Sequence, residues 1–335
     1  MLLIFSYQLM EFRTAVELPI GKVEIKHSDK LLLLGSCFAE NMGAWMQQYK
    51  FRCDINPFGI LYNPYSIAEA LQRLMDQRYY ELADLFSAHG QWHSYMHHSS
   101  FSANTAEETL DNINQRIQHV SIPDTDCLIM TWGTAWVYRL KENGRIVGNC
   151  HKMPEKIFQR ELLTVDEIVS RWIPIIQQLR HEQPSLKIIF TVSPIRHLRD
   201  GMHENQLSKS TLLLAIRQLC LLSEGCYYFP SYELMMDELR DYRFYAEDMI
   251  HPSQVAVNYI WECFCKSYFS PLTLKIMKEW DEIKKGLAHR PFDAQSEAYR
   301  NFLMKIVLKI EQIKEKFPYF ELEKELELCR TRLKI

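Results

Sequence analysis

Short apolar runs alternate along the chain with longer stretches in which apolar residues recur at helical spacing. The apolar runs have the length and continuity of strands that are buried on both faces, and they cover residues 31–34, 126–130, 187–192 and 227–229. Helical patterns of ten residues or more lie between them. Strands that alternate with helices in this way are typical of a parallel sheet covered on both faces, so the pattern predicts an α/β fold.

Capping residues give the starts of several predicted helices. A helix is expected over residues 40–50, directly after the first apolar run. Asn63 followed by Pro64 favours a helix start, because Asn caps the free N–H groups and Pro fits the first helical position. Thr164-x-x-Glu167 forms a capping box, and Ser253 begins a further helix.

The last part of the chain has a different pattern. From about Ser296 it becomes rich in charge, while an apolar stripe keeps helical spacing through Phe302, Ile306, Ile310, Ile313 and Phe317. Pro318 ends this stripe, and residues 321–333 follow as a second helix. The sequence therefore predicts a main domain over residues 10–270 and a helical extension over 271–335. The extension is expected to pack on the main domain or on a partner, such as a second copy of the chain.

Composition narrows the class of protein. The chain has 335 residues, a net charge of −3 and 47% hydrophobic residues. These values are ordinary for a protein with a packed core, and no overall positive charge favours nucleic acid as a partner. No apolar run reaches the length of a membrane span.

The cysteines and the N-terminus bear on the compartment. The nine cysteines are odd in number and lack disulfide-framework or zinc spacing, so reduced thiols and no metal are expected. Residues 1–9 are apolar but lack a basic start and a cleavage site, which favours Met10 as the true initiator over a signal peptide. The chain is predicted to be cytoplasmic.

The first candidate for chemistry follows the first predicted strand, at Gly35-Ser36-Cys37. Ligands of open parallel sheets bind beyond the carboxyl ends of the strands. Gly35 permits a tight turn there, and the next helix directs its positive end at Ser36 and Cys37, which favours a thiolate or an oxyanion. Spacing alone is equally consistent with Ser36 as a helix cap and Cys37 as a core thiol.

The second candidate follows the last predicted strand. Asp248 precedes His251 by three residues, directly before a helix, and Pro252 fixes the backbone next to the histidine. A histidine held by a carboxylate is the arrangement of a general base.

With these motifs the chain resembles the GSCFA family, which takes its title from residues 35–39 (Gly-Ser-Cys-Phe-Ala) and belongs to the SGNH/GDSL hydrolase superfamily. The resemblance covers residues 10–270. Further matching stretches lie at residues 56–59, 133–136, 149–152 and 193–197. It implies a three-layer α/β/α, flavodoxin-like fold and esterase, lipase or acyl-transfer chemistry on O-acyl groups, with no cofactor.

The resemblance also implies roles for individual residues. The superfamily places its nucleophile two residues after the glycine, which selects Cys37, with Ser36 as the second candidate. His251 would be the base and Asp248 its orienting carboxylate. The backbone N–H groups near Cys37 and of Gly59 would hold the oxyanion.

One superfamily block is not matched. The superfamily has Gly-x-Asn-Asp, whose Asn donates to the oxyanion, whereas residues 133–136 read Gly-Thr-Ala-Trp. Loss of such a donor costs about two to three orders of magnitude in rate. Either another amide replaces it, with Asn149 as the candidate, or hydrolysis is weak or absent.

Other polar residues are candidates for substrate binding. Gly133 and Thr134 follow a predicted strand, and His151 is a rival base. Arg196 and His197 follow the strand at residues 187–192, where Arg196 would bind a carboxylate or phosphate of the substrate or pair with a surface acid.

A histidine cluster lies outside these motifs. His93 and His97 are spaced i, i+4 and would suit a metal if helical, but no carboxylate partner is near. Ordinary surface or loop histidines are the preferred interpretation.

The leading hypothesis is a hydrolase or O-acyltransferase acting on an acyl ester. By analogy with the superfamily, the substrate would be an acylated carbohydrate or cell-wall precursor. The alternative is a catalytically weak or inactive binding protein on a hydrolase scaffold. A third reading is a partner-docking protein that acts through the helical extension.

Overall fold

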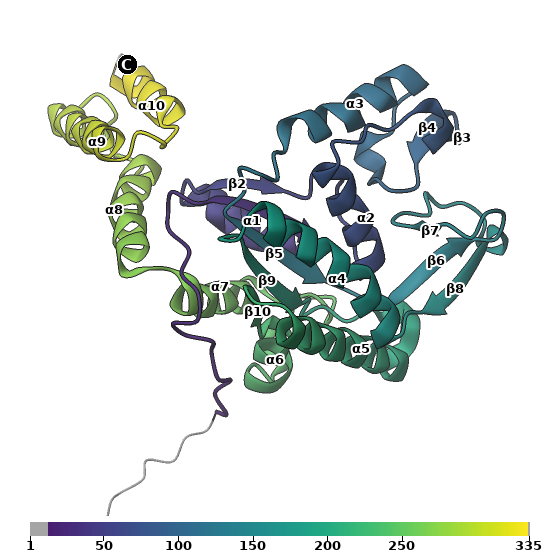
Figure 1. The fold of residues 1–335 in the computed structure, drawn as a ribbon. Coiled ribbons are helices and arrows are strands. Elements are labelled where there is room, and N and C mark those ends of the chain that lie inside the picture. The colour runs from purple at the N-terminus through teal and green to yellow at the C-terminus, as the bar shows by residue number, and fades with distance from the viewer. Residues whose placement is uncertain (1–12, 334–335) are drawn as a thin grey trace, which may run out of the picture.

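A five-stranded parallel sheet lies at the centre of the protein (Figure 1). The structure is a computed structural model that describes residues 13–333, so the proposed start at Met10 lies outside the described residues. In sheet order the strands are β10 (Cys226–Phe229), β9 (Lys187–Val192), β5 (Cys127–Trp132), β1 (Lys30–Gly35) and β2 (Arg52–Ile55). Numbered along the chain, this is the flavodoxin-like order 2-1-3-4-5.

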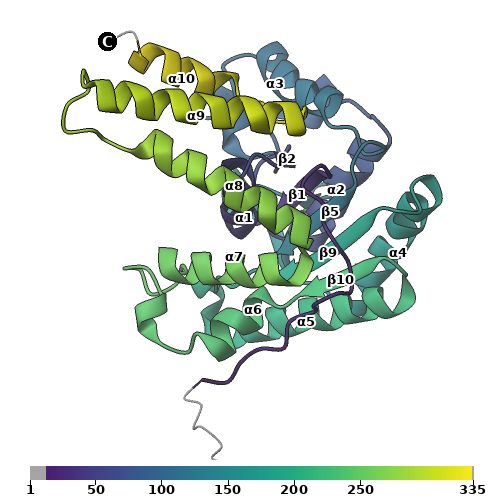
Figure 2. The same cartoon turned by 90° about the vertical axis from the view of Figure 1, so that its left-hand side faces the viewer.

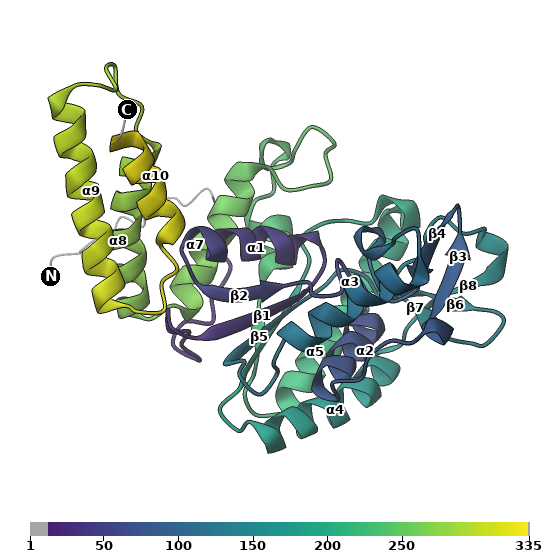
Figure 3. The same cartoon turned by 90° about the horizontal axis from the view of Figure 1, so that it is seen from above.

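Helices cover both faces of the sheet, as Figure 3 shows from above. One face carries α1 (Cys37–Gln48) and α7 (Gln254–Tyr268), and the other carries α2 (Pro64–Met75), α3 (Ala106–His119), α4 (Val165–Glu182) and α5 (Gly201–Leu222). Side chains of β1 alternate between the faces, with Leu31 and Leu33 packed toward α1 and α7, and Leu32 and Leu34 toward the other helices. The predicted three-layer α/β/α class is confirmed.

The predicted helix starts are confirmed by their caps. Asn63 Oδ1 accepts from Ser66 N at 2.8 Å, and Ser253 Oγ accepts from Ala256 N at 3.3 Å. Thr164 and Glu167 form the reciprocal capping box. Helix α1, in contrast, begins at Cys37, three residues before its predicted start, with the result that Ser36 is its cap.

Two small antiparallel sheets interrupt the α/β pattern and were not predicted. They are the hairpin of β3 (Leu85–Ala88) and β4 (Gln91–Ser94), and a three-stranded sheet of β7 (Ile146–Val147), β6 (Trp136–Leu140) and β8 (Phe158–Leu162). Short helical turns complete the loops: η1 (Leu82–Asp84), η2 (Ser99–Phe101), η3 (Glu155–Ile157), η4 (Leu198–Asp200), α6 (Ser231–Glu233), the π-helical η5 (Leu234–Glu238) and η6 (Tyr242–Phe244). Strand β6 starts four residues after β5 ends, so the second small sheet extends the carboxyl edge of the main sheet.

Three helices form the C-terminal extension, which Figure 2 shows from its own side. It lies on the side of the main sheet away from β6–β8 (Figures 1 and 3). They are α8 (Pro271–Ala288), α9 (Glu297–Lys316) and α10 (Glu323–Leu333). The predicted hairpin is α9 and α10, whereas α8 was not predicted as a separate helix. The three helices share an apolar core of their own. Among residues 13–333, no helix is long and apolar enough to cross a membrane.

The extension packs against the main domain through aromatic residues. Trp280 Nε1 donates to the Gln48 carbonyl at 2.8 Å. The His27 ring stacks on Phe51 and on Phe320, with ring centroids 4.3 and 4.8 Å apart. The extension was predicted to pack on the main domain or on a partner, and in this structure it packs on the main domain.

Candidate functional site

A cavity of about 620 Å³ lies at the carboxyl ends of β1, β5 and β9, and we call it the strand-end cavity. It includes the point where the strand order reverses, between β1 and β5, which is where open α/β sheets bind ligands. A larger hollow of about 810 Å³ lies at the opposite, amino end of β1 beside α10, and none of the predicted site residues lines it.

The turn from β1 into α1 requires its glycine. Gly35 has φ +143°, and a Cβ atom there would lie 2.1 Å from the Thr131 carbonyl oxygen. Its N–H donates to Asn56 Oδ1 at 2.8 Å, and the next N–H, of Ser36, donates to Thr131 O at 3.1 Å. These contacts fix the backbone that presents Cys37.

Ser36 and Cys37 both line the strand-end cavity but differ in what holds them. Ser36 is 1% exposed, and its Oγ accepts from Phe38 N at 3.3 Å as the cap of α1. Cys37 is half-buried as the first residue of the helix. Its N–H is one of the free donors of the first helical turn.

The electrostatics of Cys37 differ from the sequence-based expectation. Burial raises the pKa of the thiol, and the Glu40 carboxylate raises it further. The backbone N–H groups of Cys37 and Phe38 and the Lys209 charge act in the opposite direction but do not outweigh burial. The expected thiolate is therefore not the resting form, and Cys37 needs a base to become a nucleophile at neutral pH.

His251 enters the same cavity from the loop before α7. Its Nδ1–H donates to Asp248 Oδ2 at 2.5 Å, which leaves Nε2 as the nitrogen free to accept a proton. Asp248 Oδ1 accepts from the N–H groups of Ile250 and His251, both at 2.9 Å. These bonds lower the pKa of Asp248 to about 2, so it stays ionised. No hydrogen bond joins Cys37 to His251 in the described residues.

A buried lysine that the sequence reasoning missed lies behind the loops that form the cavity wall. Lys209 of α5 is fully buried, and its Nζ donates to the carbonyls of Gly133 at 2.7 Å and Ser193 at 2.8 Å. It thereby joins the loops that follow β5 and β9. Burial lowers the pKa of Lys209 to about 7, and the neighbouring Cys37 opposes this shift.

Two asparagines present amide groups to the cavity. Asn63 Oδ1 accepts from Ser66 N, and Asn149 Oδ1 accepts from His151 N at 2.9 Å. In both residues the side-chain oxygen accepts from a backbone N–H, whereas the Nδ2 group forms no hydrogen bond within the described residues. The Nδ2 group can therefore donate to a ligand. Asn149 was predicted for this role, whereas Asn63 was recognised only as a helix cap.

Gly59 does not line the strand-end cavity. Its N–H donates to the Asn56 carbonyl at 2.7 Å, within a turn in which Gly59 has φ +78°. A Cβ atom on Gly59 would lie 2.2 Å from His98 Cβ, which explains the glycine. The N–H that was predicted to hold an oxyanion is thus engaged within the chain.

Gly133 and Thr134 shape the wall between β5 and β6. Their N–H groups donate to the Tyr62 carbonyl at 2.7 and 3.1 Å. Thr134 lines the cavity, and its Oγ1 is 3.0 Å from Ser208 Oγ. These two residues therefore hold the loop containing Tyr62 and Asn63 against the carboxyl edge.

His151, the rival base, lies outside the cavity lining. It is buried, with Nε2 2.8 Å from the Ser94 carbonyl and Nδ1 3.3 Å from Ser99 Oγ. His93 lies on β4 and His97 in the loop after it, and both are buried, so of the interpretation as surface or loop histidines only the loop position of His97 holds. Within residues 13–333, no group of three or more His, Cys, Asp or Glu side chains suits a metal ion.

Arg196 and His197 both line the cavity, as expected from their place after β9. Burial lowers the pKa of His197 to about 4, and the charges of Lys209, Arg160 and His251 add to this effect. Arg196 has no carboxylate within ion-pair distance in the described part of the chain, and its Nε is enclosed without a hydrogen-bond partner. The surface acid that was the alternative partner of Arg196 is therefore absent from residues 13–333.

Comparison with known proteins places the chain in a family. The model of the GSCFA family matches residues 30–264, which is well over half of the chain. The chain belongs to the GSCFA family. The model described as "GSCFA domain protein, C-terminal domain" matches residues 280–335. The chain matches no curated protein in sequence.

Among solved structures, the chain is similar to a Clostridium thermocellum family 3 carbohydrate esterase. The two are 10% identical with a TM-score of 0.32, and the match covers 75% of this chain and 98% of the other.

The two GSCFA matches correspond to distinct parts of the structure. The first contains every residue of the strand-end cavity, and the second covers the end of α8 with α9 and α10. In this GSCFA chain the candidate site residues that line the cavity thus all lie in the α/β domain, and the extension contributes none of the lining.

Proposed function

We propose that the protein is an ester hydrolase or O-acyltransferase of the SGNH type, with Cys37 as its nucleophile. The observation that carries this proposal is that Cys37 and His251, from opposite ends of the α/β domain, line one cavity. His251 is held by Asp248 so that Nε2 is free. A nucleophile, a base and an orienting carboxylate are the parts that acyl transfer requires.

The reaction proceeds in two steps. His251 Nε2 takes the proton of the Cys37 thiol as the sulfur attacks the ester carbonyl, and the tetrahedral intermediate carries the negative charge on oxygen. Collapse breaks the ester C–O bond, and the leaving alcohol takes the proton from His251. Water or an acceptor alcohol then attacks the acyl-cysteine, with His251 again accepting and returning the proton.

The surroundings of the two candidates favour Cys37 over Ser36. The Ser36 hydroxyl caps α1 and is almost fully buried, so its loss would free a helix N–H as well as the hydroxyl. Cys37 is more exposed and occupies the superfamily register. The raised pKa of Cys37 makes the general base obligatory and gives His251 its role.

Donors to the oxyanion are present even though the superfamily block is not matched. The N–H of Cys37 is one, and the Nδ2 group of Asn63 or Asn149 is the second. We favour Asn63, because its loop is tied to the turn that presents Cys37: the Leu61 N–H donates to the Gly35 carbonyl at 3.1 Å. An acylated carbohydrate or cell-wall precursor is the proposed substrate class, by analogy with the superfamily alone.

The test is transfer of an acetyl group from 4-nitrophenyl acetate, followed by mass spectrometry of the trapped protein. The acetyl group is expected on Cys37, and Cys37→Ala and His251→Gln should each reduce turnover by about 100- to 10,000-fold. Cys150→Ala is the matched control, because Cys150 is a second half-buried thiol lining the same cavity, and its turnover should stay unchanged. An acetyl group on Ser36 would instead reverse the assignment of the nucleophile.

The second candidate function is binding without catalysis. It is favoured by the raised pKa of Cys37 and by the lack of a hydrogen bond between Cys37 and His251 in the described residues. It predicts no acyl-cysteine, and iodoacetamide labelling of Cys37 that does not depend on His251. Labelling that slows in His251→Gln would contradict it.

A further inference from the structure

More positive than negative side chains line the strand-end cavity. Arg160, Arg196, Arg199 and Asp200 line it, which gives three positive charges against one negative charge. Lys209 adds a buried amino group beside the wall. The cavity is therefore electropositive, although the whole chain has a net charge of −3.

Two of the three arginines already have partners. Arg160 forms an ion pair with Asp200, and its guanidinium lies 4.1 Å from the ring centre of Trp136. Arg199 forms an ion pair with Glu155 on the open rim. Arg196 is left over, with no carboxylate within reach among residues 13–333 and with its Nε enclosed and unbonded.

Arg196 is half-buried, and its enclosed Nε has no hydrogen-bond partner, which is costly unless a ligand uses it. Burying an unsatisfied polar group costs free energy, and a guanidinium presents a planar set of donors that matches the two oxygens of a carboxylate or phosphate. Arg196 also lies in the loop after β9, next to His197, at the edge of the sheet where Cys37 and His251 meet the same space.

We propose that Arg196 is the core of an oxyanion-binding subsite, so that the ligand of the cavity carries a carboxylate or a phosphate group. That this ligand is an ester rests on the proposed function, whereas the anion subsite does not. Arg196 binds the anionic end of the ligand and leaves the reacting carbonyl for Cys37. The subsite thereby selects charged esters over neutral ones of the same acyl group.

Direct binding tests the subsite without any turnover. Inorganic phosphate and succinate are titrated into the full chain by calorimetry at constant ionic strength, and the two anions distinguish a phosphate-bearing from a carboxylate-bearing ligand. The expected result is saturable binding of at least one anion, weakened about tenfold or more in Arg196→Gln. Arg196→Lys, which keeps the charge but loses the planar donors, should fall between the two.

Arg199→Gln is the matched control. Arg199 lines the same cavity but is already paired with Glu155 on the surface, so its removal should change the dissociation constant by about twofold at most. Equal weakening in Arg196→Gln and Arg199→Gln would overturn the proposal, because it would indicate diffuse positive charge. Absence of binding of both anions to the wild type would overturn it as well.

Turnover then links the subsite to the reaction. The ratio of kcat/KM for the 4-nitrophenyl monoester of succinate to that for 4-nitrophenyl acetate should fall about tenfold or more in Arg196→Gln. A constant ratio, together with lost acetyl transfer in Cys37→Ala, would refute the subsite and leave the proposed function intact. Anion binding that depends on Arg196, with no acyl-cysteine from either ester, would support the subsite and refute the proposed function.

Discussion

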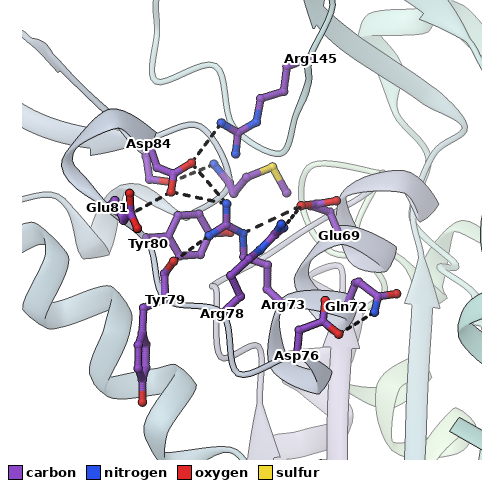
Figure 4. Close-up of polar contacts among 12 residues, drawn as sticks. Glu69, Gln72, Arg73, Asp76, Arg78, Tyr79, Tyr80, Glu81, Asp84 and Arg145 are labelled. Carbon is purple, nitrogen blue, oxygen red and sulfur yellow. Dashed lines mark hydrogen bonds and ion pairs between the residues drawn. The ribbon is translucent and has the colours of Figure 1, made fainter. Parts of the chain in front are cut away.

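Two arginines of the α/β domain have opposite surroundings. Arg73 of α2 is buried in the cluster of Figure 4, where it pairs with Asp84 at 3.3 Å and donates to the Tyr79 carbonyl at 3.1 Å. Its guanidinium lies 3.7 Å from the ring centre of Tyr80. Arg196, by contrast, lines the strand-end cavity with no ion pair in the described residues.

The charged groups around Arg73 pair with one another and stabilise the fold, whereas Arg196 remains available to a ligand. The Arg73 cluster connects α2 to the segment that leads into the β3–β4 hairpin, and Arg145 reaches the same Asp84 from the loop between β6 and β7. Its charges therefore join three segments of the chain. The cavity is lined by more than three segments, but its amides, its base and Arg196 keep donors or acceptors that form no hydrogen bond or ion pair within the described residues. Substitutions in the first region should change stability, and those in the second should change binding and rate.

The largest expected effect is on turnover in Asn63→Ser. Serine keeps the cap of α2 but removes the amide, so the rate of 4-nitrophenyl acetate hydrolysis should fall by about 100- to 1,000-fold if Asn63 holds the oxyanion. Thermal unfolding should change little. Asn149→Ser is the matched variant, and a larger loss of rate there than in Asn63→Ser would transfer the role to Asn149.

The next effect is on the stability of the first region. Arg73→Met leaves Asp84 and Glu69 without their buried partner, so the free energy of unfolding from urea titration should fall by about 3 kcal/mol. Arg78→Met is the control, because Arg78 pairs with the same Glu69 but is 56% exposed, and its loss should cost less than about 1 kcal/mol. Equal losses in the two variants would mean that burial of Arg73 is not what matters.

Most of the α/β framework was predictable because its signals are local. Strand β9 was predicted with its observed ends, and the caps at Asn63, Thr164 and Ser253 gave three helix starts, since each cap depends only on residues within one turn. Strand β2 was missed because it is an edge strand whose sequence, from Arg52 to Ile55, is partly exposed and has no continuous apolar run. The β6–β8 sheet was missed because β6 pairs with β8, which follows β7 and a further loop and is therefore not local in sequence.

The site was predictable only where a motif carried it. Cys37, Ser36, Asp248 and His251 lie beside a strand end or in a short motif, and the structure brings Cys37 and His251 to one cavity. Residue spacing could not show whether the Gly59 N–H is free to bind an oxyanion, because the turn at residues 56–59 determines its hydrogen bond to the Asn56 carbonyl.

Lys209 is different, because a signal was present in the sequence. It lies three residues before Leu212 and seven before Ile216, on the buried face of α5, so a charged residue stood where the helical pattern required an apolar one.

A third prediction concerns that buried lysine and pH. Burial lowers the pKa of Lys209 to about 7 in the folded protein, whereas an unfolded lysine has a pKa near 10.4. Between these values the unfolded state binds the extra proton, so this group makes folding more favourable as pH rises. Relative to Lys209→Met, the wild type should therefore gain about 1 kcal/mol of unfolding free energy from pH 7.5 to 8.5.

The comparison with Lys209→Met cancels the contributions of groups that Lys209 does not affect, such as Cys127 and Tyr268, whose raised pKa values favour unfolding as pH increases. Urea titrations at the two pH values provide the measurement. A difference between the two proteins that does not vary with pH would show that Lys209 is charged throughout this range.

The smallest expected effect completes the comparison of the two arginines. Arg196→Met removes a guanidinium that has no ion pair among residues 13–333 and an enclosed Nε without a partner, so it removes a desolvation cost together with a side-chain hydrogen bond to Tyr232. The free energy of unfolding should change by less than about 1 kcal/mol, and a small gain is consistent with a residue kept for binding rather than stability. Arg73→Met, the same substitution in the other region, serves as the reference. A loss in Arg196→Met as large as that in Arg73→Met would show that Arg196 holds the fold, and the distinction between the two regions would then fail.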